Sequence, residues 1–282
     1  KWQRRFLTWG IVIAVFGMRI IFPLAIVAIA AKLDPISAIN LSLNDPERYE
    51  QIVSSAHIGI AGFGGAFLTM VGLNFFFDGD KDVDWIRGLE LALRRFSEVK
   101  AAEIGILLLL LYGISTMLAE DEAMVFLSSG ILGIITYIAV DAVGSLLDKV
   151  ERKKMAAGAV RSGIGGFLYL EVLDASFSFD GVIGAFALSN NMLIIAIGLS
   201  IGAMFVRSMT VHLVRAGTLS KYRFLEHGAF WAIIALGLIM LFSAKYHISE
   251  SITGLIGAVL IGISLLWSLR YNRKHGRQTD TV

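Results

Sequence analysis

Three carboxylates stand within one apolar stretch of membrane length, residues 163–191. They are Glu171, Asp174 and Asp180, and Ser178 lies between the two aspartates. About twenty apolar residues cross a bilayer as a helix, and an ionised carboxylate facing lipid at its centre would cost about 2.5 to 3.5 kcal/mol. These acids should therefore face protein, water or a cation. An acid cluster at membrane depth is a candidate functional site.

The spacing of these residues limits how they could act together. At about 100° per residue, Glu171, Asp174 and Ser178 share one face of a regular helix. Asp180 falls on the opposite side, so a continuous helix cannot aim all three acids at one point. Gly181 follows directly and permits an unwound turn, where backbone carbonyls could join the carboxylates. Such oxygen ligands suit hard cations such as Mn2+, Ca2+ or Mg2+.

Two arginines offer a different partner for the same acids. Arg19 and Arg207 each lie deep in an apolar span and must be neutralised there. Asp174 and Asp180 are the simplest counter-charges. Two interpretations stay open: the arginines balance or gate an ion site, or the ion pairs only lock the helix bundle.

The composition indicates which elements must position these residues. The chain has 282 residues, of which 56% are hydrophobic and 17% charged, which is typical of a helical membrane protein in a lipid bilayer. It has no cysteine, so oxygen and imidazole are the available metal ligands. The net charge of +2, with the basic residues in short blocks between apolar runs, argues against nucleic-acid binding.

The apolar runs predict an all-α fold with eight transmembrane helices. They are residues 6–31, 52–77, 101–118, 124–147, 163–188, 192–214, 228–244 and 254–269. Of the 25 lysines and arginines, two lie within spans, 20 lie in odd-numbered connecting segments and three in even-numbered ones. By the positive-inside rule, the odd-numbered segments, which include both chain ends, are expected to be cytoplasmic. The expected location is the inner membrane of the cell.

Two connecting segments have a distinct pattern. Segment 32–51 contains two prolines and a turn-rich Asn-Asp-Pro sequence, which predicts a long external loop. Segment 78–100 has apolar residues at helical spacing, which predicts an amphipathic helix on the cytoplasmic interface. Those residues are Trp85, Ile86, Leu89, Leu93 and Phe96. Glycine-rich stretches beginning at Gly59 and Gly198 lie inside spans and predict close helix packing.

Two pairs of stretches match each other and indicate an inverted repeat. Residues 9–19 match 197–207, both ending in arginine, and residues 56–73 match 226–241. The charge pattern orients the two copies oppositely, as in transporters with a site between the halves. We expect one further N-terminal helix with a mirror acidic motif in the full protein. The expected segments are 1–100, the first repeat; 101–162, a connecting hairpin and basic loop; 163–269, the second repeat; and 270–282, a basic tail.

The acidic motif resembles a known family. The sequence Asp-Ala-Ser-Phe-Ser-Phe-Asp-Gly at 174–181, the arginine helix ending at Arg207, and Phe-Leu-Glu-His-Gly-Ala from Phe224 are similar to the TerC family, named for tellurium resistance. The resemblance covers nearly the whole chain and implies manganese or calcium handling, with kinship to the LysE-type exporters. It assigns the motif acids to Asp174 and Asp180. Many members have Asn or Ser where this chain has Gly181.

Taken together, these patterns favour a divalent cation transporter, with Mn2+ efflux across the bacterial inner membrane first and Ca2+ as a second ion. We expect Asp174 and Asp180 as ligands, Ser178 as an oxygen donor and Glu171 as an ancillary ligand or proton carrier, with Arg19 and Arg207 as counter-charges. The alternative is an assembly or stress-resistance scaffold without transport. The chain has no recognisable catalytic motif, so we expect no enzyme activity. A homo-oligomer is compatible with either function.

Overall fold

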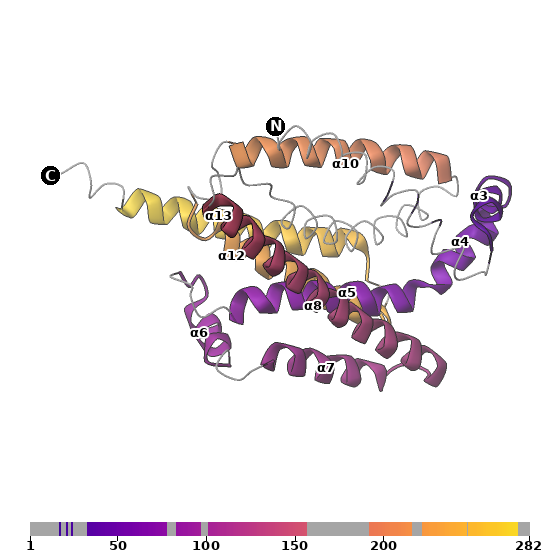
Figure 1. Ribbon diagram of the computed structural model, residues 1–282, viewed down its shortest axis with the longest axis horizontal. Helices are drawn as coiled ribbons and strands as arrows, with labels where there is room; N and C mark the ends of the chain where they lie inside the picture. Colours follow the sequence, from indigo (N-terminus) through magenta and orange to yellow (C-terminus); the bar gives the residue numbers. More distant parts are fainter. Residues whose placement is uncertain are drawn as a thin grey trace. The chain divides into compact units, whose positions relative to one another are not determined.

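The computed structural model describes residues 33–77, 83–96, 101–156, 192–215, 222–246 and 248–275, together with the single residues 17, 21 and 24. Within these ranges the regular secondary structure is helical and contains no strand (Figure 1). The prediction of an all-α chain is therefore confirmed for this part of the protein. The helices are α3 (Pro35–Asn44), α4 (Pro46–Ser55), α5 (His57–Phe77), α6 (Arg87–Phe96), α7 (Ala102–Ser115), α8 (Glu120–Ala156), α10 (Met192–Arg215), α12 (Leu225–Ser243) and α13 (Glu250–His275).

Four of these helices contain a segment long and apolar enough to cross a membrane. The segments are His57–Phe77, Glu120–Leu146, Leu225–Ser243 and Ser251–Lys274. Two further apolar helices are shorter, Ala102–Ser115 and Ile194–Val206. All six fall within predicted spans or overlap them, and together they indicate a membrane protein. The predicted spans 6–31 and 163–188 lie outside the residues that the structure describes, apart from isolated positions in the first.

Segment 32–51, which was predicted to be a long external loop, is not irregular, because α3 and α4 occupy most of it. Both prolines stand at the first position of a helix, where the missing N–H costs nothing. Asp34 caps α3 by accepting the backbone N–H of Ile36 at 3.1 Å and of Ser37 at 3.0 Å. The Ser37 hydroxyl, which donates to Asp34 at 2.6 Å, is the main cause that lowers the pKa of this carboxyl. The Asp-Pro pairs at 34–35 and 45–46 therefore mark the starts of two helices.

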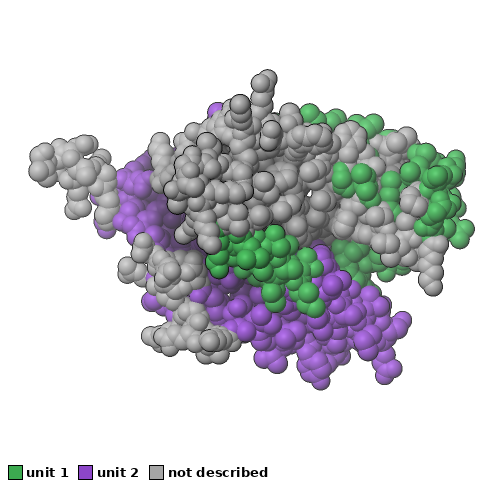
Figure 2. Space-filling view, viewed as in Figure 1, with its two compact units in different colours: residues 1–60, 135–209 green, residues 61–134, 210–282 purple. Residues whose placement is uncertain are grey.

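The chain divides into two compact units, coloured separately in Figure 2. Unit 1 comprises residues 1–60 and 135–209, and unit 2 comprises residues 61–134 and 210–282. In unit 1, α3 packs against α4, and Ala38 and Tyr49 are fully buried. Unit 2 holds most of α5, all of α6, α7, α12 and α13, and the first part of α8. It also contains the polar contacts around Glu90 and the start of α12.

Helix α5 packs against its neighbours in unit 2 through glycine. A Cβ atom added at Gly62 would lie 2.6 Å from the backbone oxygen of Phe126 in α8. One added at Gly65 would lie 2.7 Å from Leu241 Cγ and 2.9 Å from the backbone oxygen of Gly237 in α12. The predicted packing role of the glycines that begin at Gly59 is thus confirmed at these two positions.

The α5–α12 pair is antiparallel. Gly65 approaches Leu241, whereas Gly72, about two helical turns further along α5, approaches Ile234 in the earlier part of α12. At the end of α5, the Phe75 ring stacks on that of Phe230 with centroids 3.7 Å apart. The two helices that match in sequence, residues 56–73 and 226–241, are therefore direct neighbours that run in opposite directions.

The last helix of unit 2, α13, lies beside α12 and contacts it through small residues. Gly228 in α12 approaches the side chain of Ser264, and Ser264 and Ser268 are fully buried. Most of the large apolar side chains of α13 are exposed instead, for example Leu255 and Leu266. The second glycine stretch, at Gly198 and Gly202 in α10, has no atom of the described residues within 4 Å of either Cβ position.

Candidate functional site

The residues predicted to form the ion site are largely outside the structure's described ranges. Glu171, Asp174, Ser178 and Asp180 all lie there, and so does Arg19. Arg207 belongs to α10, but its side chain is not among those described. Among the described residues, no three His, Asp or Glu side chains stand close enough together to hold a metal ion. The predicted acid cluster thus stays a prediction.

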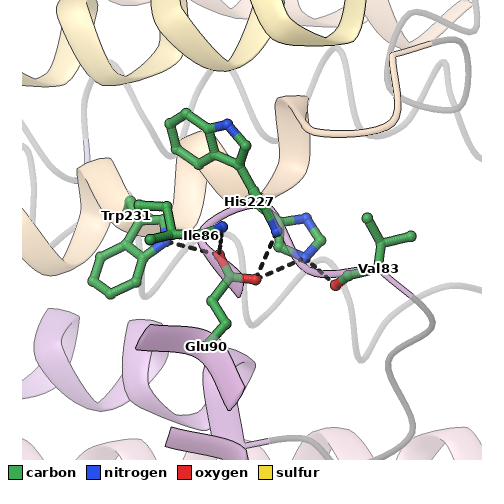
Figure 3. A network of polar contacts seen from close by, with 6 residues as sticks. Val83, Ile86, Glu90, His227 and Trp231 are labelled. Carbon is green, nitrogen blue, oxygen red and sulfur yellow. Dashed lines mark hydrogen bonds and ion pairs between the residues drawn. The ribbon is translucent and has the colours of Figure 1, made fainter. Parts of the chain in front are cut away.

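The described part of the chain contains a different buried carboxylate, Glu90. It lies in the first turn of α6 and is only 3% exposed. Its Oε2 accepts the backbone N–H of Trp85 at 2.9 Å, and its Oε1 accepts that of Ile86 at 3.2 Å. These two amides precede the helix and have no partner within it, so Glu90 acts like the reciprocal acid of a capping box. Its Oε1 also accepts the indole N–H of Trp231 in α12, at 3.1 Å (Figure 3).

His227, in the first turn of α12, completes this group of contacts. Its Nε2 lies 2.7 Å from the backbone oxygen of Val83 and 3.7 Å from Glu90 Oε2. Because Val83 can only accept, we assign the proton to Nε2, which donates to Val83. The other ring nitrogen, Nδ1, is buried and has no hydrogen-bond partner in the described part of the chain. We call Val83, Trp85, Ile86, Glu90, His227 and Trp231 the Glu90 network.

The aromatic surroundings hold the histidine ring in place. Phe75 from the end of α5 meets the His227 ring edge-on, with centroids 5.3 Å apart. Phe76 contacts Trp231 at a centroid distance of 4.4 Å. Leu93 of α6 packs against the same apolar cluster. The network is therefore shielded from water, which strengthens each of its hydrogen bonds and makes removal of any one partner costly.

The Glu90 network has a positioning role. Both carboxylate oxygens already accept hydrogen bonds from neutral donors, and a single acid with a single histidine falls short of a metal site. What the contacts do is fasten the short helix α6 to the first two turns of α12. The described residues 83–93 and the start of α12 consequently lie at the same end of α5 and α12.

A second set of contacts fastens the same end of α12 to α13. The backbone N–H of Phe224 donates to Ser268 Oγ at 2.9 Å. Arg223 Nη1 donates to the Tyr271 hydroxyl at 3.0 Å, and its guanidinium lies 5.0 Å from the centre of that ring. The start of α12 is thus bound on one side to α6 and on the other to α13.

Little in the sequence singles out Glu90 and His227. Glu90 counts as one more charge on an amphipathic helix, and His227 as a polar residue at a helix end. One signal was present: Glu90 is the single acid in α6, and a histidine followed four residues later by a tryptophan places two N–H donors on one face of α12. Which acid those donors meet depends on tertiary contacts between residues some 140 positions apart.

The fold and these contacts define a helical membrane protein whose apolar helices are tied together at one end by buried polar groups. The chain belongs to the family DUF475, described as "Protein of unknown function", whose family model matches residues 1–275. No curated protein matches the chain. No solved structure matches it either.

Proposed function

We propose that this protein transports a divalent cation across the membrane, with Mn2+ efflux as the favoured activity and Ca2+ as a second candidate ion. The observation that carries the proposal is the placement of Glu171, Asp174 and Asp180 within one apolar stretch of membrane length. Acids at that depth are costly unless a cation or a basic group meets them. The four membrane-length helices supply the bilayer context that this argument requires.

Two further observations support the proposal. The matched stretches 56–73 and 226–241 belong to α5 and α12, which pack antiparallel, as an inverted repeat around a central site requires. The motif at 174–181 and the arginine helix ending at Arg207 resemble the TerC family, whose members are associated with manganese and calcium. The repeat and the family resemblance thus favour an ion site over isolated buried charges.

In this proposal each motif residue has a stated role. Asp174 and Asp180 bind the ion, Ser178 donates an oxygen, and Glu171 is an ancillary ligand or carries a proton. Arg19 and Arg207 balance the acids when the ion has left. Exchange of a divalent cation for protons is chemically suited to carboxylates, because the same oxygens bind either.

The test is a charge-removing substitution with little change in shape. Asp174→Asn and Asp180→Asn are expressed in cells that lack their own manganese exporter, and cellular manganese is measured during Mn2+ challenge. We expect each variant to accumulate manganese and to lose protection, with at least a tenfold loss of Mn2+ flux in proteoliposomes. Asp121→Asn, an exposed acid at the start of α8, serves as the matched control and should transport normally.

The scaffold alternative makes a different forecast for the same variants. If the acids serve only to lock the helices against Arg19 and Arg207, the asparagine variants lose membrane insertion or thermal stability. Purified wild-type protein then moves no Mn2+ in proteoliposomes. Equal manganese content in cells with wild-type protein and with well-inserted variants would overturn the transport proposal.

A further inference from the structure

Helix α6 has two different flanks, and its contacts with the rest of unit 2 fix which way each flank points. Glu90 is buried in the Glu90 network, and Leu93 packs against the apolar cluster at the end of α5. These two residues set the rotation of α6 about its own axis. Leu89 and Leu91 then fall on opposite flanks, about 160° apart, and are similarly exposed, at 47% and 43%.

The two flanks differ in chemistry. Leu89 shares its flank with the helix positions of Ala92 and Phe96, and Ile86 just before the helix is also exposed. The flank of Leu91 includes the positions of all three arginines of α6, which are Arg87, Arg94 and Arg95. Glu90 is the only acid of this helix, and its carboxylate is already satisfied by neutral donors of the protein. Apart from Glu90, the charged residues in the sequence of α6 are therefore all arginines.

The location of α6 brings these flanks to the edge of the membrane. The helix follows α5 and precedes α7 in the chain, and Figure 1 shows it crossing at the ends of these two helices rather than continuing either. The Glu90 network ties it to His227 and Trp231, in the first two turns of the membrane-length helix α12. In a bilayer crossed by the membrane-length helices α5 and α12, a short helix held at their ends would lie at the depth of the lipid headgroups.

We propose that α6 binds the anionic lipid leaflet, with the Leu89 flank among the acyl chains and the three arginines on the headgroup phosphates. An amphipathic helix lying in the interface buries its apolar flank at the boundary between headgroups and acyl chains. Basic residues at that depth are attracted to anionic lipid, and the attraction weakens with salt. The partner is thus a lipid surface rich in acidic phospholipid. This interaction is independent of the proposed transport.

The structure adds two things to the amphipathic pattern of the sequence. It places Leu89 and Leu91 on opposite exposed flanks, of which only that of Leu91 includes arginine positions. It also removes Glu90 from the exposed charge of α6, because that carboxylate is turned into the protein. A soluble protein partner on the same flank would require Leu89 to lie in water when the protein is alone in a bilayer.

The test uses the absence of native cysteine in the chain. Leu89→Cys and Leu91→Cys are each labelled with a fluorophore in the full-length protein, which is then reconstituted in phosphatidylcholine vesicles with or without phosphatidylglycerol. Lipids brominated on their acyl chains should quench the label at 89 at least threefold more than the label at 91. Aqueous iodide should show the opposite order. Equal quenching of the two labels by both reagents overturns the proposal.

The second arm tests the arginines. Phosphatidylglycerol should deepen the label at 89, and either added salt or the double change Arg94→Gln and Arg95→Gln should abolish the effect. Retention of phosphatidylglycerol by the purified protein, measured by mass spectrometry, should fall about tenfold in the same variant. Salt acts on the unaltered arginines, so it keeps the test valid if the double variant folds poorly. A label depth that ignores lipid charge and salt contradicts the proposal.

Discussion

Helices α5 and α13 are both long and apolar, yet they have opposite surroundings. In α5, 78% of the most apolar 18-residue window is buried inside the protein, whereas in α13 the share is 11%. Hydrophobicity therefore says that each can cross a membrane and leaves open whether protein or lipid covers it. In a water-soluble protein, the more exposed helix would have a polar face. Lipid tails are as apolar as leucine, so a helix exposed to lipid needs no such face.

What separates the two helices is the size of the residues at their contacts. Helix α5 brings its backbone close to both α8 and α12 at glycine positions, where an added Cβ would collide with backbone atoms. The glycines of α13 at 254 and 262 have no described atom within 4 Å of a Cβ, and its buried residues include Ser264 and Ser268. Glycine contacts with two neighbouring helices thus accompany the more buried helix α5, and buried serines accompany the more exposed helix α13.

The largest expected effect comes from one methyl group placed in either helix. Gly62→Ala should destabilise the protein by about 3 kcal/mol, because the clash is with the Phe126 carbonyl and no rotamer relieves it. Gly262→Ala in α13 meets open space and should be neutral or stabilising by up to about 1 kcal/mol. Thermal unfolding of the purified protein in detergent measures both. Similar melting temperatures for the two variants would break the comparison.

The next largest effect concerns the Glu90 network, which joins α6 to the start of α12. Glu90→Ala should cost about 2 kcal/mol, because it leaves the buried amide of Trp85, and the partly buried amide of Ile86 and indole of Trp231, without their acceptor. Amide hydrogen exchange should accelerate in residues 83–96 before other regions. Glu103→Ala, in the first turn of α7, is the control. Equal exchange rates in both variants would mean that α6 is held by other contacts.

A smaller effect should separate two tryptophans. Trp231→Phe keeps the ring contact with Phe76 but loses the hydrogen bond to Glu90, so we expect a loss of about 1 kcal/mol. Trp267 in α13 is 45% exposed, and Trp267→Phe should change stability very little. Unfolding midpoints of the two variants sharpen the comparison between the more buried helix and the more exposed helix α13. A larger loss at Trp267 would reverse it.

The smallest effect is expected in α3, whose first turn is capped by the neighbouring side chain of Asp34 and not by a contact with another helix. The lowered pKa of Asp34 means that its capping contribution is complete above the unfolded value of 3.8 and is lost as the pH falls through the lower folded value. Hydrogen exchange of the Ile36 and Ser37 amides should thus accelerate only in acid. Asp34→Asn keeps an acceptor and should remove the pH dependence, which a mass-spectrometric exchange series would detect.

The sequence predicts the helical class and the positions of the described apolar helices because both depend on local composition. Runs such as 52–77 and 228–244 match α5 and α12 closely. The packing of the glycines near Gly62 follows from the same local pattern, since small residues inside a span serve close approach. The prediction for segment 32–51 failed because proline, which disrupts the interior of a helix, is also well suited to the first position of one, as at Pro35 and Pro46.

The site divides along the same line. The predicted acids Asp174 and Asp180 follow from charge in an apolar run and stay a prediction, as does the inverted repeat. The Glu90 network was missed, because its members come from segments 83–90 and 227–231 and nothing local joins them. Buried polar networks between distant segments depend on tertiary geometry, which neither periodicity nor propensity contains.

Three of the five tryptophans of the chain lie around the start of α12. The rings of Trp85 and Trp267 meet edge-on with centroids 5.6 Å apart, while Trp231 is bound to Glu90. This asymmetric indole pair should produce a near-ultraviolet circular dichroism signal that depends on α6 staying in place. The protein thus carries its own optical reporter of that helix, readable without any label, while ions or lipids are added.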